Sequence, residues 1–315
     1  SQITASRQLS AVVFACALCT VTTSPLFLGI DGGTESIRAA LFDQKGSLVA
    51  MHSKEYRTLF PKAGWAEQNP QEWWDAMGDA VKGVIAKADN PEVAGMCVDT
   101  TCCSVVALGA GGEPLAPAIL WMDQRAAQEA TDILQKAKGD PALSVHCGGQ
   151  GPVSAEFMLP KALWLKTNKP EVWAQASTIC EYQDYVNLQL TGRICASACN
   201  AAARWNCDGE EATADKSGKG GRPLGVLDKV EMRDLADKWP HDVLPMGALV
   251  GEVTKEAAAH LGVKPGLRVV QGGPDAFVGL VGLGCIKQGE LGLITGSSHL
   301  HIIVSKEPKT APGIW

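Results

Sequence analysis

The stretch Phe27-Leu-Gly-Ile-Asp31-Gly-Gly-Thr34-Glu-Ser36-Ile-Arg38-Ala-Ala-Leu-Phe42-Asp43 decides the fold at the start of this chain. Its apolar run brings Asp31 to the end of a predicted strand, and residues 36–42 predict a second strand that returns beside the first. Gly32 and Gly33 predict a tight turn whose backbone amides can face an anion. The stretch therefore indicates a hairpin that binds phosphate. The alternative is an ordinary β-hairpin, because Asp-Gly is common in hairpin turns.

The composition is that of a globular chain with a small-molecule partner. Its 315 residues, 46% of them hydrophobic, are enough for two domains or one large domain with a real core. The net charge is -6, from 28 basic and 34 acidic residues, and no basic block occurs outside residues 216–222. This charge pattern argues against a nucleic-acid partner.

Residues 1–25 differ from the rest of the chain and predict a targeting remnant or a disordered segment. They are rich in Ser and Thr, contain one Arg and no acidic residue, and surround an apolar run at 11–18. A run of that length is too short to span a membrane as a helix, so we expect no membrane partner. The lack of a basic start favours an organellar transit segment over a secretory signal.

The eleven cysteines predict reduced thiols, because their number is odd and their density is below that of a disulfide scaffold. Cys16 and Cys19 form a CxxC without a second pair at zinc spacing. Cys102 and Cys103 are adjacent, which would strain a bond between them. We therefore interpret most cysteines as small buried hydrophobic residues.

The remaining pattern alternates strand-like and helix-like segments, which predicts an α/β fold. The segment 208–223 has no apolar period and predicts a flexible surface loop. We expect further strands at 47–56, 93–99, 105–108, 118–121, 249–253 and 267–271, and helices at 70–88, 124–138, 159–167, 180–190, 232–238 and 255–261.

Asp275 is the second acidic residue that could take part in catalysis. It follows an apolar strand and two glycines and precedes a helix of small residues at 276–284. Phosphoryl transfer needs one carboxylate to accept the proton of the attacking hydroxyl and another to hold Mg²⁺. Asp275 and Asp31 could divide these roles, but Asp275 could also simply cap the following helix.

A third piece is the hydroxyl-rich turn Thr295-Gly296-Ser297-Ser298, which follows a predicted strand. Such turns offer amides and hydroxyls to phosphate groups. They are also frequent as plain β-turns.

These three pieces, in this order, resemble the FGGY carbohydrate kinases of the actin-like ATPase superfamily, from about Phe27 to Trp315. The first phosphate motif of that family has the form Asp-x-Gly-Thr-x-Ser-x-Arg, and the stretch from Asp31 to Arg38 matches it. Further family-like stretches are residues 64–74, 120–126, 160–165 and 184–192.

The resemblance implies ATP and Mg²⁺ as cofactors and assigns roles to single residues. Asp275 is expected to be the general base, and Asp31 is expected to lie by the metal and the transferred phosphate. The expected ATP-binding residues are Gly32, Gly33, Thr34, Ser36, Arg38, Thr295, Gly296, Ser297 and Ser298. The expected sugar-binding residues are Thr101, Cys102, Asp123, Arg125 and Asp275. Asp123 and Arg125 could instead be a surface ion pair at a helix start.

For the fold, the resemblance implies an actin-like ATPase domain of the ribonuclease H-like type, with a mixed sheet and flanking helices. We expect the N-terminal sugar-kinase domain at 26–271 and the truncated start of a second such domain at 272–315. The adenosine-binding motif of the family would lie beyond Trp315. Apolar segments left uncovered in this way should be unstable or recruit a partner chain.

Residues 98–106, 121–125 and 180–185 look most like the xylulokinase-like sugar kinases of plants and cyanobacteria, which act on D-ribulose. The expected reaction is ATP-dependent phosphorylation of D-ribulose to D-ribulose 5-phosphate, in a plastid or otherwise in the cytoplasm. D-Xylulose is the nearest alternative substrate, since the two sugars differ at one hydroxyl. The other alternative is a non-catalytic binding or structural protein that keeps the first domain.

Overall fold

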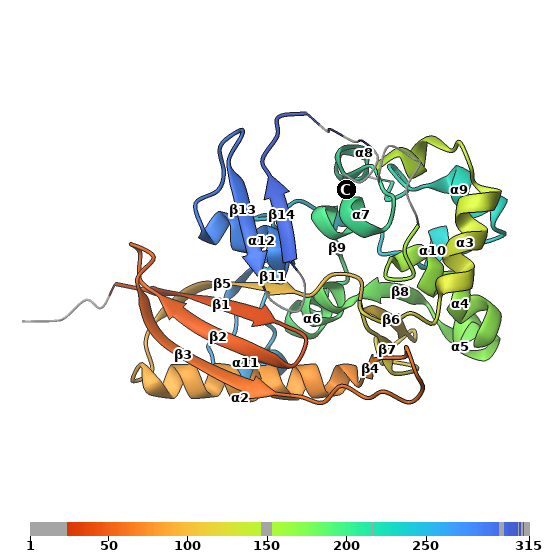
Figure 1. Cartoon of the computed structure of the whole chain (residues 1–315). Coiled ribbons are helices and arrows are strands. Elements are labelled where there is room, and N and C mark those ends of the chain that lie inside the picture. Colours follow the sequence, from red (N-terminus) through yellow and green to blue (C-terminus); the bar gives the residue numbers. More distant parts are fainter. Residues whose placement is uncertain are drawn as a thin grey trace, which may run out of the picture.

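A six-stranded mixed sheet is the centre of the structure, a computed structural model that describes residues 24–145, 153–215, 217–295, 299–307, 309 and 311. Its strand order is β11-β12-β5-β1-β2-β3 (Figure 1). The first three strands form an antiparallel meander, β5 and β12 run parallel to β1, and β11 is antiparallel to β12. The strands are β1 (Leu26–Gly32), β2 (Ser36–Phe42), β3 (Leu48–Glu55), β5 (Val93–Thr100), β11 (Leu249–Glu252) and β12 (Arg268–Pro274).

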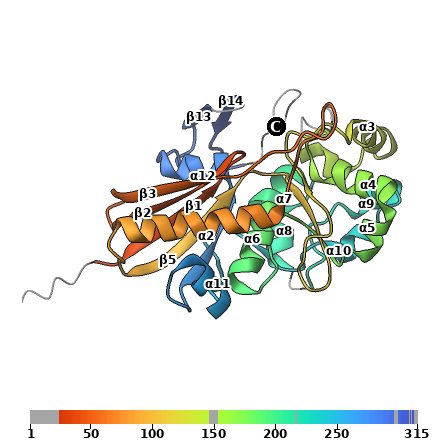
Figure 2. The same ribbon diagram turned by 90° about the horizontal axis from the view of Figure 1, so that it is seen from below.

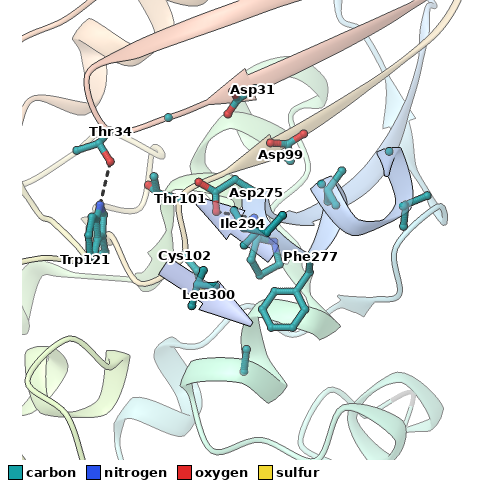
Figure 3. Close-up of a pocket in the computed structure, with 18 of the residues that line it drawn as sticks. Asp31, Thr34, Asp99, Thr101, Cys102, Trp121, Asp275, Phe277, Ile294 and Leu300 are labelled. Atoms are coloured by element: carbon teal, nitrogen blue, oxygen red, sulfur yellow. Dashed lines mark hydrogen bonds between the residues drawn. The ribbon is translucent and has the colours of Figure 1, made fainter. Parts of the chain in front are cut away.

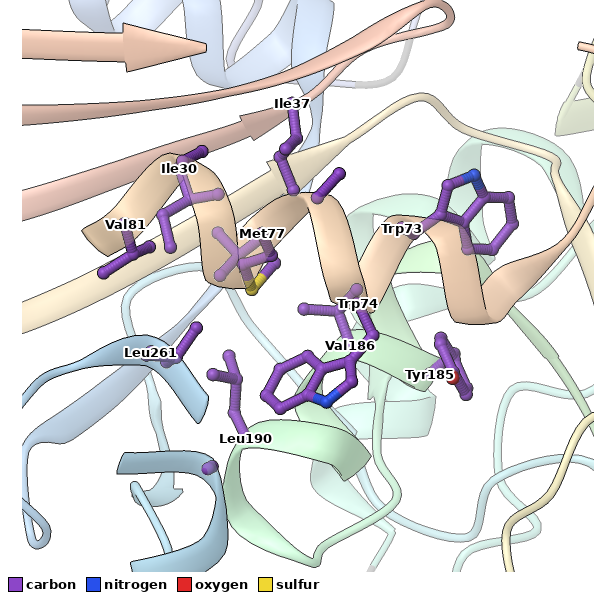
Figure 4. Packing of buried hydrophobic residues seen from close by; sticks show 14 of the residues in the cluster. Ile30, Ile37, Trp73, Trp74, Met77, Val81, Tyr185, Val186, Leu190 and Leu261 are labelled. Atoms are coloured by element: carbon purple, nitrogen blue, oxygen red, sulfur yellow. The ribbon is translucent and has the colours of Figure 1, made fainter. Parts of the chain in front are cut away.

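Helix α2 (Pro70–Lys87) covers one face of this sheet (Figure 2). It begins where predicted, because the Asn69 side chain accepts a hydrogen bond from the Gln71 amide and Pro70 takes a first-turn position where no amide is needed. Helices α6 (Tyr182–Thr191) and α11 (Lys255–Leu261) pack on the same side. Side chains such as Ile30, Met77 and Leu190 form the core between these layers (Figure 4).

Strand alternation sends different residues to the two faces of the sheet. Leu28 and Ile30 on β1, like Val98 on β5, are buried toward α2. Asp31 and Asp99 occupy the alternate positions and line a cleft on the opposite face. One face of the sheet therefore builds the core and the other carries the polar groups.

A second core lies beside the first, around a four-stranded sheet with the order β4-β7-β6-β8. Trp205 and Trp239 pack within it, with ring centroids 4.2 Å apart. Its strands are β4 (Glu67–Gln68), β6 (Val105–Leu108), β7 (Ala118–Ile119) and β8 (Thr178–Glu181). The helices in this region are α3 (Ala127–Lys136), α4 (Met158–Asn168), α5 (Pro170–Gln175), α9 (Leu224–Lys229) and α10 (Leu235–Lys238), with a short 3-10 turn, η1, at Pro141–Val145.

The remaining elements frame the cleft or connect the two cores. In Figure 1, α12 and the hairpin β13–β14 stand over the polar face of the six-stranded sheet. These elements are α7 (Ala198–Arg204), α8 (Gly209–Ala214), α12 (Asp275–Gly282), β9 (Ala196–Ser197), β10 (Val243–Leu244), β13 (Leu291–Thr295) and β14 (His299–Ile303).

Several predicted segments were wrong in part. The helices expected at 124–138 and 232–238 begin only at Ala127 and Leu235. Cys180 and Glu181 belong to strand β8, because they pair with β6, and the helix begins only at Tyr182. The segment 208–223 contains helix α8, since the Asp208 carboxylate accepts from the amides of Glu210 and Glu211 and so caps a helical turn.

The region after β12 exposes apolar side chains, as the sequence suggested. Val281, Leu283, Ile286 and Ile303 are all more than half exposed. Strand β12 runs on through Pro274 within the first sheet, so the expected domain division after residue 271 stays a prediction. Among the described residues, no helix has the length and apolar character needed to cross a membrane. The targeting segment expected at 1–25 lies outside the described residues except for Ser24 and Pro25.

Candidate active site

A cleft of about 1040 Å³ opens on the polar face of the six-stranded sheet (Figure 3). Its walls come from β1, β5, α7, α12 and the β13–β14 hairpin. The carboxyl ends of β1, β5 and β12 meet in it, because these three strands are parallel neighbours. In open α/β sheets, ligands bind at such strand ends.

Asp31 and Asp99 face each other at this edge. They are register partners on β1 and β5, so both side chains leave the sheet on the cleft side. The Arg38 guanidinium, opposite Asp31 on β2, donates to the Asp31 carboxylate at 2.7 Å. Asp31 and Arg38 thus lie together at the cleft.

Asp99 is a site residue that the sequence reasoning missed. Burial, and then the negative charges of Asp31 and Asp275, raise the pKa of Asp99 to about 8. Carboxylates crowded in this way favour a divalent cation with oxygen ligands, such as Mg²⁺. The signal was present in the sequence, since the strand 93–99 ends on a polar residue.

Asp275 is the third carboxylate of the cleft and begins helix α12. Burial raises the pKa of Asp275, and the charge of Asp31 adds to that effect. The Ala276 amide donates to the Asp275 carboxylate at 2.7 Å. Asp275 therefore bonds an amide at the helix start and also lines the cleft, so the capping alternative does not exclude a chemical role.

Thr34 lies at the tip of the first hairpin, and side chains around it hold it in place. The Trp121 indole donates to the Thr34 hydroxyl at 3.0 Å, and the Gln68 amide donates to the Thr34 carbonyl at 2.7 Å. The Tyr56 hydroxyl donates to the adjacent Gly33 carbonyl. A turn fixed in this manner presents the Thr34 side chain to the cleft without the entropy cost of ordering it later.

The expected use of the glycine amides needs correction. The Gly33 amide donates to the Ser36 carbonyl at 3.1 Å, so it closes the hairpin. Gly32 points away from the cleft, toward Tyr182, where an added Cβ would lie 2.9 Å from the Tyr182 hydroxyl oxygen. Gly32 and Ser36 do not line the cleft, whereas Gly33 does.

Asp123 and Arg125 also need correction, because neither lines the cleft. Asp123 is fully buried and accepts from the Ala66 amide at 2.6 Å. The Arg125 guanidinium donates to Asp123 at 2.7 Å and 2.9 Å and stacks 3.8 Å from the Trp65 ring centroid. The two residues form a buried ion pair, which differs both from a sugar contact and from the surface pair considered as the alternative.

At the other expected positions, Thr101, Cys102 and Thr295 line the cleft. The Thr101 amide donates to the Gly32 carbonyl at 3.0 Å, which joins the first hairpin to the end of β5. Gly296, Ser297 and Ser298 lie outside the described residues. Lining residues that were not predicted as site residues include Asp99, Cys103, Trp121, Glu156, Arg204 and Phe277.

Comparison with known proteins gives a consistent result. Residues 26–213 match the N-terminal domain of the FGGY family of carbohydrate kinases. The chain is 31% identical to a human FGGY carbohydrate kinase domain-containing protein, covering 92% of this chain and 55% of that protein. It is 29% identical to the ribulokinase of Geobacillus thermodenitrificans (91% and 54% covered) and 31% identical to the xylulose kinase of Lactococcus lactis (90% and 54% covered). The chain thus spans about half the length of these relatives.

Solved structures share the fold. The ligand-bound xylulose kinase of Lactobacillus acidophilus superposes with a TM-score of 0.73 at 24% identity, over 87% of this chain and 53% of that one. The glycerol kinase of Plasmodium falciparum with ADP gives 0.76 at 18% identity, over 89% and 54%. The mixed sheet and its helices are therefore those of the actin-like sugar kinases, as predicted.

Proposed function

Because the chain belongs to the FGGY family of carbohydrate kinases, we propose that it carries the catalytic cleft of a kinase that phosphorylates a ketopentose with ATP. The observation that carries the proposal is the meeting of Asp31, Asp99 and Asp275 in one cleft, beside the Thr34 turn. The preferred substrate is D-ribulose and the product D-ribulose 5-phosphate. D-Xylulose is the alternative, since relatives carry both ribulokinase and xylulose kinase names.

Asp275 is the proposed general base. Its partly buried position raises the pKa of the carboxyl, which makes the carboxylate a better acceptor for the proton of the sugar hydroxyl. The hydrogen bond from the Ala276 amide orients the carboxylate at the start of α12. The sugar would lie between Asp275 and the Thr101–Cys102 end of the cleft.

Asp31 and Asp99 are the proposed holders of Mg²⁺. Their facing carboxyl groups supply the oxygen ligands that this ion prefers, and the crowding of negative charge around Asp99 fits a cation. When bound, Mg²⁺ neutralises charge on the phosphates of ATP. Thr34, Arg38 and Thr295 would contact those phosphates from the cleft wall.

Two further expectations remain proposals. The exposed apolar surface of α12, β13 and β14 would be covered by a further polypeptide, because an apolar surface of this kind favours contact with a partner. Residues 1–25 would direct the protein to a plastid.

The test is release of ADP from ATP in the presence of D-ribulose, in a coupled assay with Mg²⁺. We expect sugar-dependent ADP release by this chain, abolished in Asp275→Ala and retained in Asp242→Ala. Asp242 is the matched control, since its exposed carboxylate pairs with Arg193 away from the cleft. A higher kcat/KM for D-xylulose than for D-ribulose would overturn the assignment of D-ribulose as the preferred substrate. Equal background in the chain and in Asp275→Ala would favour the non-catalytic alternative.

A further inference from the structure

Two adjacent thiols lie side by side at the wall of the cleft. The sulfur atoms of Cys102 and Cys103 are 3.7 Å apart. Successive side chains of an extended strand point to opposite faces, so this proximity requires an unusual backbone. Cys103 provides it with a φ of 71°, in the left-handed region that residues other than glycine rarely adopt.

We propose that Cys102, Cys103 and Glu181 form a binding site for a thiophilic divalent cation of the zinc class. One ligand atom from each residue lies within 4.8 Å of the other two. Two thiolates bound to a tetrahedral Zn²⁺ at about 2.3 Å each would be roughly 3.8 Å apart. The sulfur atoms therefore already have the separation that the ion requires.

The hydrogen bonds of the three residues show how the ion would enter. The Cys103 thiol donates to the Cys102 sulfur, and the Cys102 thiol donates to the Glu181 carboxylate at 3.9 Å. Binding breaks the two S–H bonds, forms two metal–sulfur bonds and releases two protons to solvent, with no change of oxidation state. The Glu181 oxygen that loses the thiol donor keeps its hydrogen bond from the Trp205 indole and offers its other lone pair to the ion.

Groups behind the cluster hold Glu181 in place. The Cys103 amide and the Asn200 side chain each donate to its other carboxylate oxygen at 2.8 Å, and the Trp205 indole also donates to this carboxylate. Such outer partners orient the ligands of a metal. They would keep the carboxylate directed at the ion.

The ammonium of Lys161 balances the net charge of the occupied site. Two thiolates, one carboxylate and a divalent cation sum to one negative charge. The ammonium of Lys161 lies buried next to this cluster and donates to the Cys103 carbonyl at 2.8 Å. Cys102 lines the cleft, so the ion has an entry path and a position for a water ligand. Soft thiolates select zinc-class ions, whereas the carboxylates of Asp31 and Asp99 suit Mg²⁺.

The site is tested by titrating the full chain with Cd²⁺ and following the ultraviolet thiolate-to-Cd²⁺ charge-transfer band. A phosphine keeps the thiols reduced, and all proteins carry Cys16→Ser and Cys19→Ser, which removes the CxxC as a competitor. We expect one tight equivalent of Cd²⁺ that Zn²⁺ displaces and Mg²⁺ does not. Cys102→Ser should abolish that equivalent, while the control Cys285→Ser should retain it.

Two further variants keep the test independent of folding defects. Glu181→Gln retains both thiols and should weaken Cd²⁺ binding, because an amide oxygen carries no charge to hold the cation. Cys103→Ser should also lose the equivalent, with a thermal melt reported for each protein. An unchanged band in Cys102→Ser, or equal losses in Cys102→Ser and Cys285→Ser, would overturn the site.

The effect of this ion on catalysis rests on the proposed function. An ion on Cys102 would obstruct the sugar end of the cleft, so Zn²⁺ should lower the rate of ADP release. The charge-transfer band needs no turnover. An inactive chain that still binds Cd²⁺ would therefore refute the proposed kinase activity but not the metal site. An active chain without the band refutes only the metal site.

Discussion

Asp31 and Asp99 are register partners on the parallel strands β1 and β5, and this pairing places two carboxyl groups at one edge of the cleft. A protein accepts such crowding of like charges only at a cost in stability unless a proton or a cation relieves it. In this structure the relief takes the form of a raised pKa at Asp99.

Asp99 should make the stability of the Mg²⁺-free protein depend on pH. The pKa of Asp99 rises from 3.8 to about 8, so between these values the folded protein keeps a proton that the unfolded chain has lost. The contribution of Asp99 to the free energy of unfolding should therefore fall as the pH rises through this window, by at most about 1.4 kcal/mol per pH unit. Urea denaturation at several pH values measures the slope.

The matched variant for this prediction is Asp99→Asn. It should make the slope shallower, while Asp242→Asn, at an exposed carboxylate, should leave it as in the parent. Equal slopes in Asp99→Asn and the parent would show that Asp99 is ionised in the folded protein.

The Asp275→Asn variant should lose turnover but still bind the sugar. The amide preserves the shape of the side chain but cannot accept a proton, so kcat should fall by about 10²-fold to 10⁴-fold. The dissociation constant for D-ribulose, measured by calorimetry, should change little. An unchanged kcat would refute the role of general base.

Asp123→Ala should destabilise the fold strongly, because the buried Arg125 guanidinium then keeps only its salt bridge to Glu67 and the Ala66 amide loses its acceptor. Removing one member of a buried pair costs about 3–5 kcal/mol in the free energy of unfolding. The control is Arg193→Ala, whose exposed pair with Asp242 should contribute less than about 1 kcal/mol. A raised KM for the sugar in Asp123→Ala at unchanged stability would instead show that Asp123 contacts the substrate.

Gly272→Ala should also be destabilising, for a steric reason. A Cβ at this position of β12 would lie 1.9 Å from the Val98 carbonyl oxygen, and strand backbone cannot give way as a side chain can. We expect a loss of about 1–3 kcal/mol or more in urea unfolding. Gly279→Ala, where the nearest atom is a side-chain carbon of Ile294 at 3.6 Å, is the control and should be neutral or stabilising. Similar losses in both would point to glycine flexibility, and not to the close approach of strands, as the cause.

Local patterns explain which parts of the fold were predictable. The strands of the first hairpin and helix α2 follow from alternation, a Pro near the helix start and an Asn cap, all of which act within a few residues. The start of α6 was misplaced by two residues, since Cys180 and Glu181 are drawn into β8 by pairing with a strand that is distant in the sequence.

The candidate site divides in the same way. The sequence by itself determined the family, the hairpin that carries Asp31 and Thr34, and the position of Asp275 between a strand and a helix, because these depend on neighbours along the chain. Only the tertiary structure brought Asp99 to Asp31, since strand pairing between distant segments decides which side chains share a face. It also removed Asp123 and Arg125 from the cleft. Their residue types suit a sugar as well as each other, and only the fold shows that both are buried against the distant segment of Trp65, Ala66 and Glu67.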